Sequence, residues 1–384
     1  MVLPDGVREL LARLRAAGYE GWAVGGCVRD ALLGLLPKDY DLCTNATPEQ
    51  MRAAFAGLRV VETGIAHGTL TVIAGGEPYE VTTYRVDGAY TDHRRPDSVE
   101  FVREVERDLA RRDFTVNAMA YSPEAGLLDC FDGQADLEKG LIRCVGEPGA
   151  RFDEDALRIL RALRFAAVYD FSVEENTARA ARERKGSLAL VARERVSAEM
   201  GKLLCGRAAE RIAGEFGDVM AATMGARLHA QGLGATPAEL PLRLAHALQD
   251  APDVGSVLSG LRLDRATERA VRELLREKER SRPQGDADWR HLLHELGQER
   301  ALQLARWKGW PLADARTVLV RGDCWNLRQL AVTGRDLMDL GIAPGAQMGA
   351  ALEALLEAVL DGKTPNEREA LRERAKKLAG IAEK

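Results

Sequence analysis

Short apolar runs, partly alternating with polar residues, mark the first 140 residues of the chain and predict strands. A helix is predicted before these runs, from Val7 to Ala17, with Gly18 at its end. Gly75-Gly76 is typical of a tight hairpin turn between the last two runs. The strand-like runs cover residues 21–24, 40–43, 68–73 and 79–85.

From about Leu141 the pattern changes to segments rich in Ala, Leu, Arg and Glu with few β-branched runs, which predicts helices. Residues 281–285, 344–345 and 361–362 contain Gly or Pro and are expected to interrupt these helices. We therefore predict an N-terminal α/β head over residues 1–140, followed by an all-helical remainder.

The composition is that of a soluble globular protein. The 384 residues are 46% hydrophobic and 29% charged, enough chain for two or three domains. There is no run of about 18 apolar residues and no basic start followed by an apolar stretch, so we expect no membrane segment and no secretory signal. The six cysteines include no Cys-x-x-Cys pair, which is typical of reduced thiols in a cytoplasmic protein.

The net charge of −5 means that a nucleic-acid partner would need a local basic patch. Residues 158–195 are a candidate, because nine Lys or Arg residues there accompany five acids. Ordinary ion-paired or solvated helix faces would explain the same composition, and the sequence leaves both interpretations open.

A glycine pair followed by two spaced carboxylates is the most informative stretch of the chain. Gly25-Gly26 precedes Arg29, and Asp39 and Asp41 follow. Carboxylates two apart on a strand point to one face, where they can share two divalent cations. Glycines let backbone N–H groups approach a phosphate without a Cβ in the way. Solvent-facing turn residues are the alternative for the two acids, but the whole pattern predicts metal-dependent phosphoryl or nucleotidyl transfer.

A second motif places Arg111 and Arg112 directly before Asp113 and Asn117. Adjacent guanidinium groups bind phosphate oxygens well because each makes two-point contacts. Asp113 and Asn117 could accept hydrogen bonds from a ribose. An ordinary helix start with Asp113 near its cap would give the same backbone without excluding this role.

A third motif lies at residues 154–164. If this segment is one helix, Glu154, Arg158 and Arg161 share a face, and Asp155 and Arg164 lie at its edges. The opposite side is apolar and would pack: Ile159, Leu160, Leu163 and Ala167. An acid and arginines in one plane could contact the edge of a base, although salt bridges along a solvated face explain the spacing equally well.

Residues 84–97 are polar, contain Gly and Pro, and are predicted to form a loop beside the site or on the surface. Glu80, on the strand before this loop, could supply a third carboxylate, if it is more than an ordinary edge-strand residue.

These motifs closely resemble those of the class II tRNA nucleotidyltransferases, the bacterial-type CCA-adding enzymes of the polymerase β superfamily, whose near relatives are bacterial poly(A) polymerases. The resemblance is carried by GGxVRD at 25–30 with DxD at 39–41, RRDFTxNA at 111–118 and EDxxR at 154–158. A weaker resemblance to the family's tail covers residues 332–367, whereas residues 206–310 show no recognisable match.

The resemblance implies an α+β fold, with a nucleotidyltransferase head of mixed sheet and helices followed by all-α parts. The head would cover residues 1–140, a base-recognising neck 141–205, a body 206–310 and a tail 311–384. The tRNA acceptor stem and elbow would lie along neck, body and tail. We expect no membrane association and no obligate protein partner.

The resemblance also implies a role for each motif residue in adding CCA to tRNA from CTP and ATP without a template. Asp39 and Asp41 would be catalytic and bind two Mg²⁺ ions. Phosphates would be bound by Gly26 and Arg29. Triphosphate and ribose would be contacted by Arg112, Asp113 and Asn117. The base would be read by Asp155 and Arg158, with Arg161 and Arg164 positioning the base or the phosphates.

Other activities of the same family stay open. A poly(A) polymerase of this group usually carries a long basic C-terminal extension, and a CC-only enzyme would lack the intact loop that residues 84–101 supply here. An A-only enzyme and a catalytically inactive RNA-binding relative are further alternatives, and Asp39 with Asp41 argues against the last. Residues 244–250 lack an adjacent His-Asp pair, so added phosphohydrolase activity is not expected. Cys27 is interpreted as a small filler.

Overall fold

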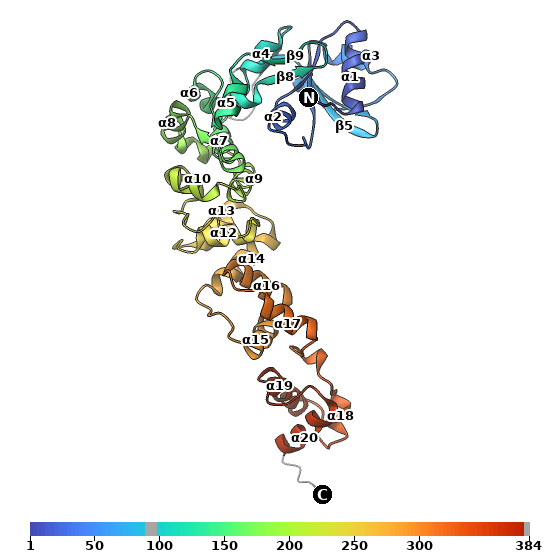
Figure 1. The fold of residues 1–384 in the computed structure, drawn as a ribbon, viewed down its shortest axis with the longest axis vertical. Coiled ribbons are helices and arrows are strands. Elements are labelled where there is room, and N and C mark those ends of the chain that lie inside the picture. The colour runs from blue at the N-terminus through green and yellow to red at the C-terminus, as the bar shows by residue number, and fades with distance from the viewer. Residues whose placement is uncertain (89–97, 380–384) are drawn as a thin grey trace. The chain divides into compact units, whose positions relative to one another are not determined.

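The computed structural model describes residues 1–88 and 98–379, and the chain divides into two compact units. The first unit comprises Met1–Gly234 and Asp250–Asp264, and the second comprises Ala235–Gln249 and Arg265–Lys384. Figure 1 colours the chain by residue number, so that the first unit is largely blue to green and the second largely orange to red. Within the described residues, no helix combines the length and the apolar character needed to cross a membrane.

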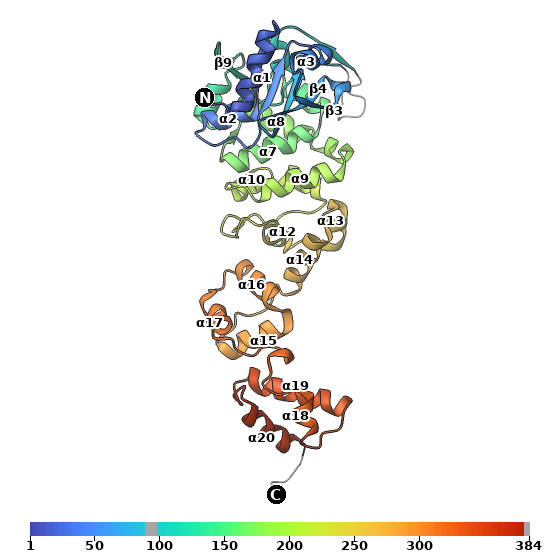
Figure 2. The same ribbon diagram turned by 90° about the vertical axis from the view of Figure 1, so that its right-hand side faces the viewer.

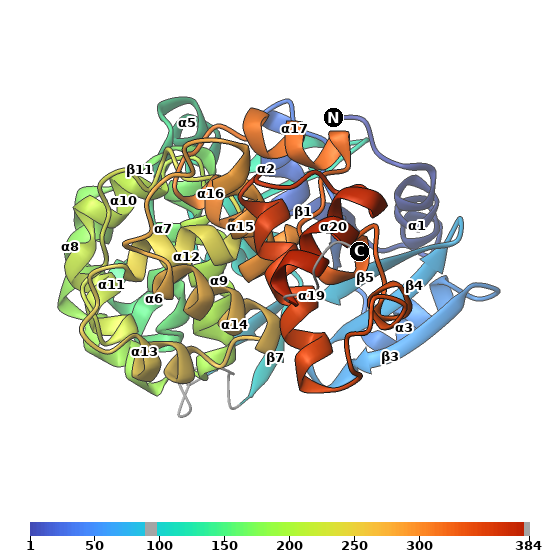
Figure 3. The ribbon, with the colours of Figure 1, turned by 90° about the horizontal axis from the view of Figure 1, so that it is seen from below.

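A seven-stranded mixed sheet forms the centre of the head, in the order β3-β4-β5-β2-β1-β8-β9. Only β2 and β5 pair in parallel; the other neighbours are antiparallel. Figure 3 shows β3, β4 and β5 side by side. The strands are β1 (Gly21–Val24), β2 (Asp41–Thr44), β3 (Arg59–Gly64), β4 (Thr69–Ala74), β5 (Glu77–Thr83), β8 (Met119–Ser122) and β9 (Gly126–Asp129).

The four predicted strand-like runs correspond to β1, β2, β4 and β5, within one or two residues at most ends. The predicted hairpin turn is also confirmed. Ala74 pairs with Glu77, which leaves Gly75 and Gly76 as a two-residue loop with φ of 60° and 89°. Positive φ at both positions is the type I′ geometry that suits the strand twist, and glycine adopts it without steric cost.

Short helices cover the sheet and connect its strands. Helix α1 (Asp5–Ala16) packs against β1 and β4, and Figure 2 shows it with α3 (Pro48–Ala54) beside the sheet. A capping box at Thr47 and Gln50 fixes the start of α3. The remaining elements of the head are α2 (Gly26–Leu32), η1 (Ile65–His67), α4 (Val105–Ala110), η2 (Thr115–Asn117), α5 (Gly133–Lys139) and the small sheet of β6 (Arg85–Asp87) with β7 (Val99–Phe101).

The rest of the first unit is helical, apart from the short parallel pair β10 (Leu141–Ile142) and β11 (Ser172–Val173). Helix α7 (Leu157–Tyr169) is its central element and packs against α9 (Arg193–Leu204). The predicted packing face of α7 is buried throughout, as expected from its apolar spacing. The other elements are α6 (Pro148–Glu154), α8 (Glu175–Glu183), η3 (Lys185–Leu190), α10 (Ala209–Glu215), α11 (Gly217–Met224) and α13 (Val254–Leu261).

In its described residues, the second unit contains helices only. Trp289 is fully buried in it, and a separate apolar cluster towards the C-terminus is built around Leu337, Leu356 and Leu371. The predicted interruptions at 281–285, 344–345 and 361–362 all fall between helices. The elements are α12 (Leu240–Leu248), α14 (Arg265–Arg276), α15 (Asp286–Leu296), α16 (Gln298–Trp307), α17 (Ala313–Arg321), η4 (Leu327–Gln329), α18 (Gly334–Met338), α19 (Ala346–Leu360) and α20 (Arg368–Leu378).

Candidate active site

Asp39 and Asp41 lie at the start of β2, and both are exposed. Asp41 is the first residue of the strand and pairs in register with Glu80 of β5. Paired residues on neighbouring strands face the same side of a sheet, so Glu80 brings a third carboxylate to the same face. The sequence interpretation of Glu80 as an edge-strand residue is wrong, because β5 lies between β4 and β2.

The electrostatics of this edge suit a divalent cation. The pKa of the Asp41 carboxyl is raised above its ordinary value by desolvation, then by the negative charges of Asp39 and Glu80, and Arg112 opposes the shift. Neither Asp39 nor Asp41 forms an ion pair within the described part of the chain. Mg²⁺ prefers such carboxylate oxygens, and a bound cation would offset the mutual repulsion of the acids.

The glycine turn lies against the second motif. Gly25 has φ +77° and caps α2, and its N–H donates to the carbonyl of Met119 at 3.1 Å. A Cβ at this position would approach the Arg112 guanidinium to 3.0 Å. Glycine is therefore required both by the backbone conformation and by the close approach of Arg112. Cys27, the second residue of α2, is buried, and this burial, followed by the charge of Asp41, raises the pKa of its thiol to about 12, which makes the thiol unreactive.

Arg29 is buried and held on all sides, rather than extended towards solvent. Its guanidinium donates to Asn117 Oδ1 at 2.5 Å and to Asp30 Oδ1 at 2.8 and 2.9 Å. The rings of Phe165 and Tyr169 lie 5.0 and 4.8 Å from it, and the Tyr169 hydroxyl donates to Asp30 at 2.9 Å. These contacts tie α2 of the head to α7, so Arg29 connects the glycine turn to the third motif.

The double-arginine motif converges on an acid that the sequence analysis missed. Arg111 donates to Asp108 at 2.7 Å, and Arg112 donates to its other oxygen at 3.1 Å. Asp108 is fully buried; although burial raises its pKa, the two guanidinium groups hold it below the ordinary value. The sequence signal for this acid was its position on α4, three and four residues before the two arginines that follow the helix. Asp108 thus orients both arginines.

Asp113 and Asn117 form the next part of the same network. Asp113 accepts from Asn117 Nδ2 at 3.1 Å and from Arg161 at 2.6 and 2.8 Å. Burial raises the pKa of Asp113, but Arg161 and Asn117 outweigh it and lower the pKa to about 2. Asp113 is therefore a buried carboxylate that links the second motif to α7.

The third motif is not one helix, contrary to the sequence prediction. Helix α6 ends at Glu154, Asp155 is extended at φ −141° and ψ 102°, and α7 begins at Leu157. Asp155 Oδ1 accepts the Leu157 N–H at 3.0 Å, as a helix-capping acid does, which favours this break. The salt-bridge alternative is confirmed for Arg158, which pairs with Glu154 four residues earlier at 2.6 Å, whereas Asp155 pairs with Arg195 at 2.8 Å.

The basic excess of residues 158–195 is largely offset by acids from other segments. Arg164, for example, pairs with Glu199 at 2.5 Å and lies over Phe165 at 3.7 Å. The interpretation as ion-paired helix faces is therefore the correct one for most of these residues, and a free basic patch is not found there in the described structure. The other pairs, at 2.6 to 4.0 Å, are Arg158–Glu154, Arg161–Asp113, Arg182–Asp218, Arg184–Asp153, Lys185–Asp218 and Arg195–Asp155.

The predicted loop falls mostly outside the described residues, which omit 89–97. Its ends are strands β6 and β7, and Tyr84 before them is fully buried. A hollow of about 260 Å³ lies next to β6 and is lined by residues of the head and of α6: Val86, Asp87, Arg107, Ala110, Arg111, Arg151 and Glu154. Asp87 belongs to the segment of residues 84–97 that the sequence singled out, whereas Arg151 lies outside all the motifs.

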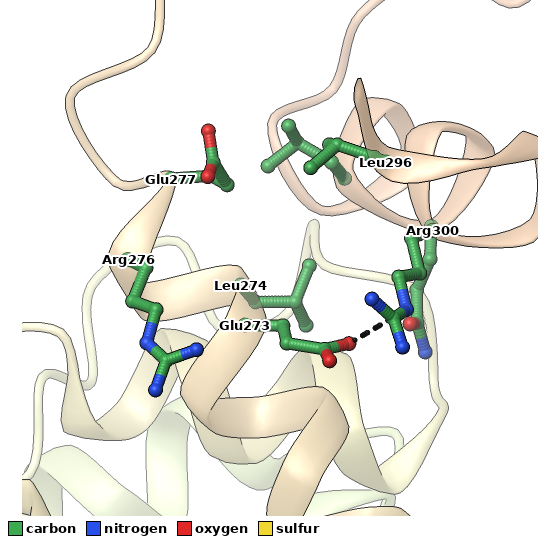
Figure 4. A pocket seen from close by; sticks show the side chains of 8 residues that line it. Glu273, Leu274, Arg276, Glu277, Leu296 and Arg300 are labelled. Atoms are coloured by element: carbon green, nitrogen blue, oxygen red, sulfur yellow. Dashed lines mark ion pairs between the residues drawn. The ribbon is translucent and has the colours of Figure 1, made fainter. Parts of the chain in front are cut away.

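The second unit has a hollow of its own, of about 150 Å³, between α14 and the α15–α16 pair. Figure 4 shows Glu273 and Arg300 facing each other, with an ion pair of 3.0 Å between them, and Leu274 and Leu296 also line the hollow. None of the predicted site residues lines it. The chemistry predicted from the motifs is therefore confined to the first unit.

Comparison with known proteins agrees with this arrangement. The model of the poly A polymerase head domain matches residues 21–143, that of an RNA- and SrmB-binding site of polymerase A matches 170–215, and that of a tRNA nucleotidyltransferase domain 2 matches 240–375. The CCA-adding enzyme of Limosilactobacillus fermentum is 36% identical over 97% of this chain and 96% of its own length. That of Enterococcus faecalis is 34% identical over 100% and 98%.

The fold also agrees with that of a solved CCA-adding enzyme. The crystal structure of the Bacillus stearothermophilus CCA-adding enzyme in complex with CTP superposes with a TM-score of 0.78, at 30% identity, over 98% of both chains. Similarity therefore extends over the head, which carries the carboxylates and the arginine network, and over the helical remainder. The chain belongs to the CCA-adding enzymes, a family of tRNA nucleotidyltransferases.

Proposed function

We propose that this protein adds CCA to the 3′ end of tRNA from CTP and ATP, without a nucleic-acid template and with release of pyrophosphate. The observation that carries the proposal is the exposed carboxylate pair, Asp39 and Asp41, at the same end of β2 as the glycine turn and Arg112. The poly(A), CC-only and A-only alternatives would use the same chemistry, whereas a purely RNA-binding relative would have no need for these acids.

Asp39 and Asp41 would hold two Mg²⁺ ions, with Glu80 as a third candidate ligand beside Asp41. Bound there, the ions would lower the pKa of the attacking tRNA 3′-hydroxyl and offset charge on the triphosphate. The neighbouring protein groups are fixed in advance, since Arg112 is held by Asp108 and lies close to Gly25. Such preorganisation is worth more than the same contacts made in water.

The remaining motif residues divide into those that contact nucleotide and those that support them. Arg112 and the turn at Gly26 would bind the triphosphate, and Arg29 would keep that turn in place through Asn117. Asp113, with Asn117, would serve the ribose while Arg161 holds its carboxylate. Asp155 and Arg158 would read the base, and Arg164 would support α7 from its contact with Glu199.

The helical remainder of the chain would hold the tRNA by its acceptor stem and elbow. Because most arginines of residues 158–195 are already paired with acids, we expect recognition to depend on the shape of the tRNA as well as on phosphate contacts. An unstructured RNA should then be a poor primer. Binding should still weaken as salt rises, since the phosphate contacts that remain release counterions.

The test is the product formed on a tRNA that ends at its discriminator base. With CTP, ATP and Mg²⁺, the expected product is three nucleotides longer and ends in CCA, and omission of Mg²⁺ abolishes it. Long A-tails on unstructured RNA would instead identify a poly(A) polymerase. A product that stops after two C residues would identify a CC-adding enzyme, and addition only to a tRNA already ending in CC would identify an A-adding one. The Asp41→Ala variant controls for contaminating activity.

A further inference from the structure

We propose that Arg195, on α9, is a positioning residue that fixes the Asp155 carboxylate in the orientation needed for base selection. The inference rests on the proposed function, because it concerns how that site distinguishes C and A from U and G. Arg195 lies outside the three motifs, 40 residues beyond Asp155 in the sequence.

The backbone around Asp155 is fixed before any side-chain partner is considered. Asp155 is extended between α6 and α7, and its carbonyl accepts the Arg158 N–H at 2.9 Å. Its Oδ1 accepts the Leu157 N–H at 3.0 Å. These bonds place the Asp155 side chain at the start of α7, but a single hydrogen bond to one oxygen leaves the carboxylate plane free to rotate.

Arg195 removes that freedom. Its Nη2 donates to Asp155 Oδ2 at 2.8 Å, and its Nη1 lies 3.5 Å from Oδ1. The planar guanidinium therefore contacts both oxygens and defines the plane of the carboxylate. A carboxylate has about four acceptor directions, and the two residues together supply three donors. The acceptor capacity left over has one defined direction, which is what recognition of a base edge requires.

The ion pair is not needed simply to join α9 to α7. These helices pack against each other, both carry fully buried leucines such as Leu160, Leu163 and Leu203, and Arg164 pairs with Glu199 between them. The side chains of Asp155 and Arg195 retain 14% and 27% exposure, so the pair is accessible from solvent at its edge. Because the pair is mostly buried, removal of either partner should also cost stability, so selectivity is the measurement that isolates the orienting role.

The experiment compares Arg195→Lys, Arg195→Met and Asp155→Ala in single additions of CTP, ATP, UTP and GTP to tRNA acceptors. Lysine keeps the charge but cannot contact both oxygens in one plane. We expect both Arg195 variants to lower the ratio of correct to incorrect kcat/KM by roughly fivefold or more, within the ~5- to 150-fold that one base contact provides. The kcat/KM for all four nucleotides should not fall in parallel, as it would after a general disturbance of α9.

Two controls separate orientation from structure. Arg193→Met removes an arginine of the same helix that donates to the carbonyls of Gly260 and Thr223, so it should cost stability without changing selectivity. In an Asp155→Ala background, Arg195→Met should have no further effect on selectivity, because Arg195 acts through the carboxylate.

Two outcomes would overturn the inference. If Asp155→Ala loses selectivity while both Arg195 variants keep it within twofold, Arg195 does not position Asp155, and base reading by Asp155 stands. If Asp155→Ala itself keeps full selectivity, the base-reading role and this inference both fall, while the CCA product assay still decides the overall activity.

Discussion

The two parts of the site use the same residue types in opposite ways. At the edge of the head where we propose metal binding, Asp39 and Asp41 have no ion-pair partner among the described residues, and Glu80 adds to their repulsion. At the junction of α6 and α7, Glu154 and Asp155 are each paired with an arginine. A cation site needs negative charge that no protein cation neutralises. A site that selects by hydrogen bonding needs neutralised charges and fixed directions for its donors and acceptors.

The largest effect should follow from removing the unpaired charge. Asp41→Ala should lower the rate of nucleotide addition on the order of 10²–10³-fold or more, because a major electrostatic contribution to the transition state is lost. Glu77→Ala, which removes an exposed acid from the hairpin end of β5, is the matched control. Single-turnover rates with CTP would measure the loss of activity in each variant. A folded Asp41→Ala protein within threefold of wild type would contradict the role of this edge.

Removal of a paired charge should instead cost stability. Asp113→Asn leaves Arg161 without its carboxylate and should destabilise the first unit by up to about 3 kcal/mol, since Arg161 is one-third exposed and water compensates part of the loss. Urea unfolding at pH 7, with hydrogen exchange of residues 157–169, would measure it. Equal exchange in both proteins would show that the pair does not hold α7.

The Asp113–Arg161 pair also makes the free energy of unfolding depend on pH. The pKa of Asp113 is about 2 in the folded protein and about 4 in an unfolded chain, so its stabilising contribution is complete above the unfolded value and is lost as the pH falls from about 4 towards 2. The stability difference between wild type and Asp113→Asn should therefore shrink over this range in acid titrations. A difference that stays constant down to pH 2 would show that folding does not lower the pKa of Asp113.

A smaller effect should separate base selection from phosphate binding. Asp155→Ala should raise misincorporation of UTP and GTP, because one base contact is worth roughly 1–3 kcal/mol of discrimination. Arg112→Ala should weaken the binding of all four nucleotides alike, since Arg112 faces the glycine turn rather than the α6–α7 junction. Kinetics with the reverse pattern would remove base reading from the α6–α7 junction.

The smallest effect should come from the link between the two parts. Tyr169→Phe removes the hydroxyl that donates to Asp30 and should cost about 1 kcal/mol of stability, without changing selectivity. Tyr121→Phe is a suitable control, because no hydrogen bond of its hydroxyl is present among the described residues. Thermal unfolding of both variants measures the difference, and equal midpoints would exclude a role for this hydrogen bond.

Local patterns predicted those parts of the fold whose determinants are local. The strands β1, β2, β4 and β5, the Gly75-Gly76 turn and the buried face of α7 all follow from short-range spacing. Strands β8 and β9 were missed because they are short and contain weak strand formers, and pairing within the sheet fixes them instead. Strand β3 was missed although it contains the strand formers Val60 and Val61.

The candidate site shows the same limit. The motif residues could be named from the sequence, but their partners could not, because Asp113–Arg161 and Asp155–Arg195 join segments 48 and 40 residues apart. The helix break at Asp155 was missed although an acid before an apolar run is a known helix start. Helical spacing continues across the break, and neither Gly nor Pro marks it.

The strand order of the head also determines when, during synthesis on the ribosome, each part of the site can find its neighbours. Strands β1 to β5 are all synthesised by residue 83, so the carboxylates of β2 can gain their neighbours early. The glycine turn cannot gain its neighbours at that stage. Gly25 donates a hydrogen bond to Met119 and Arg29 donates one to Asn117, and both partners lie on a segment that leaves the ribosome later. Since chains begin to fold during synthesis, the acids of the nascent head would be assembled before the glycine turn, and the turn would be the later part of the proposed nucleotide site to form.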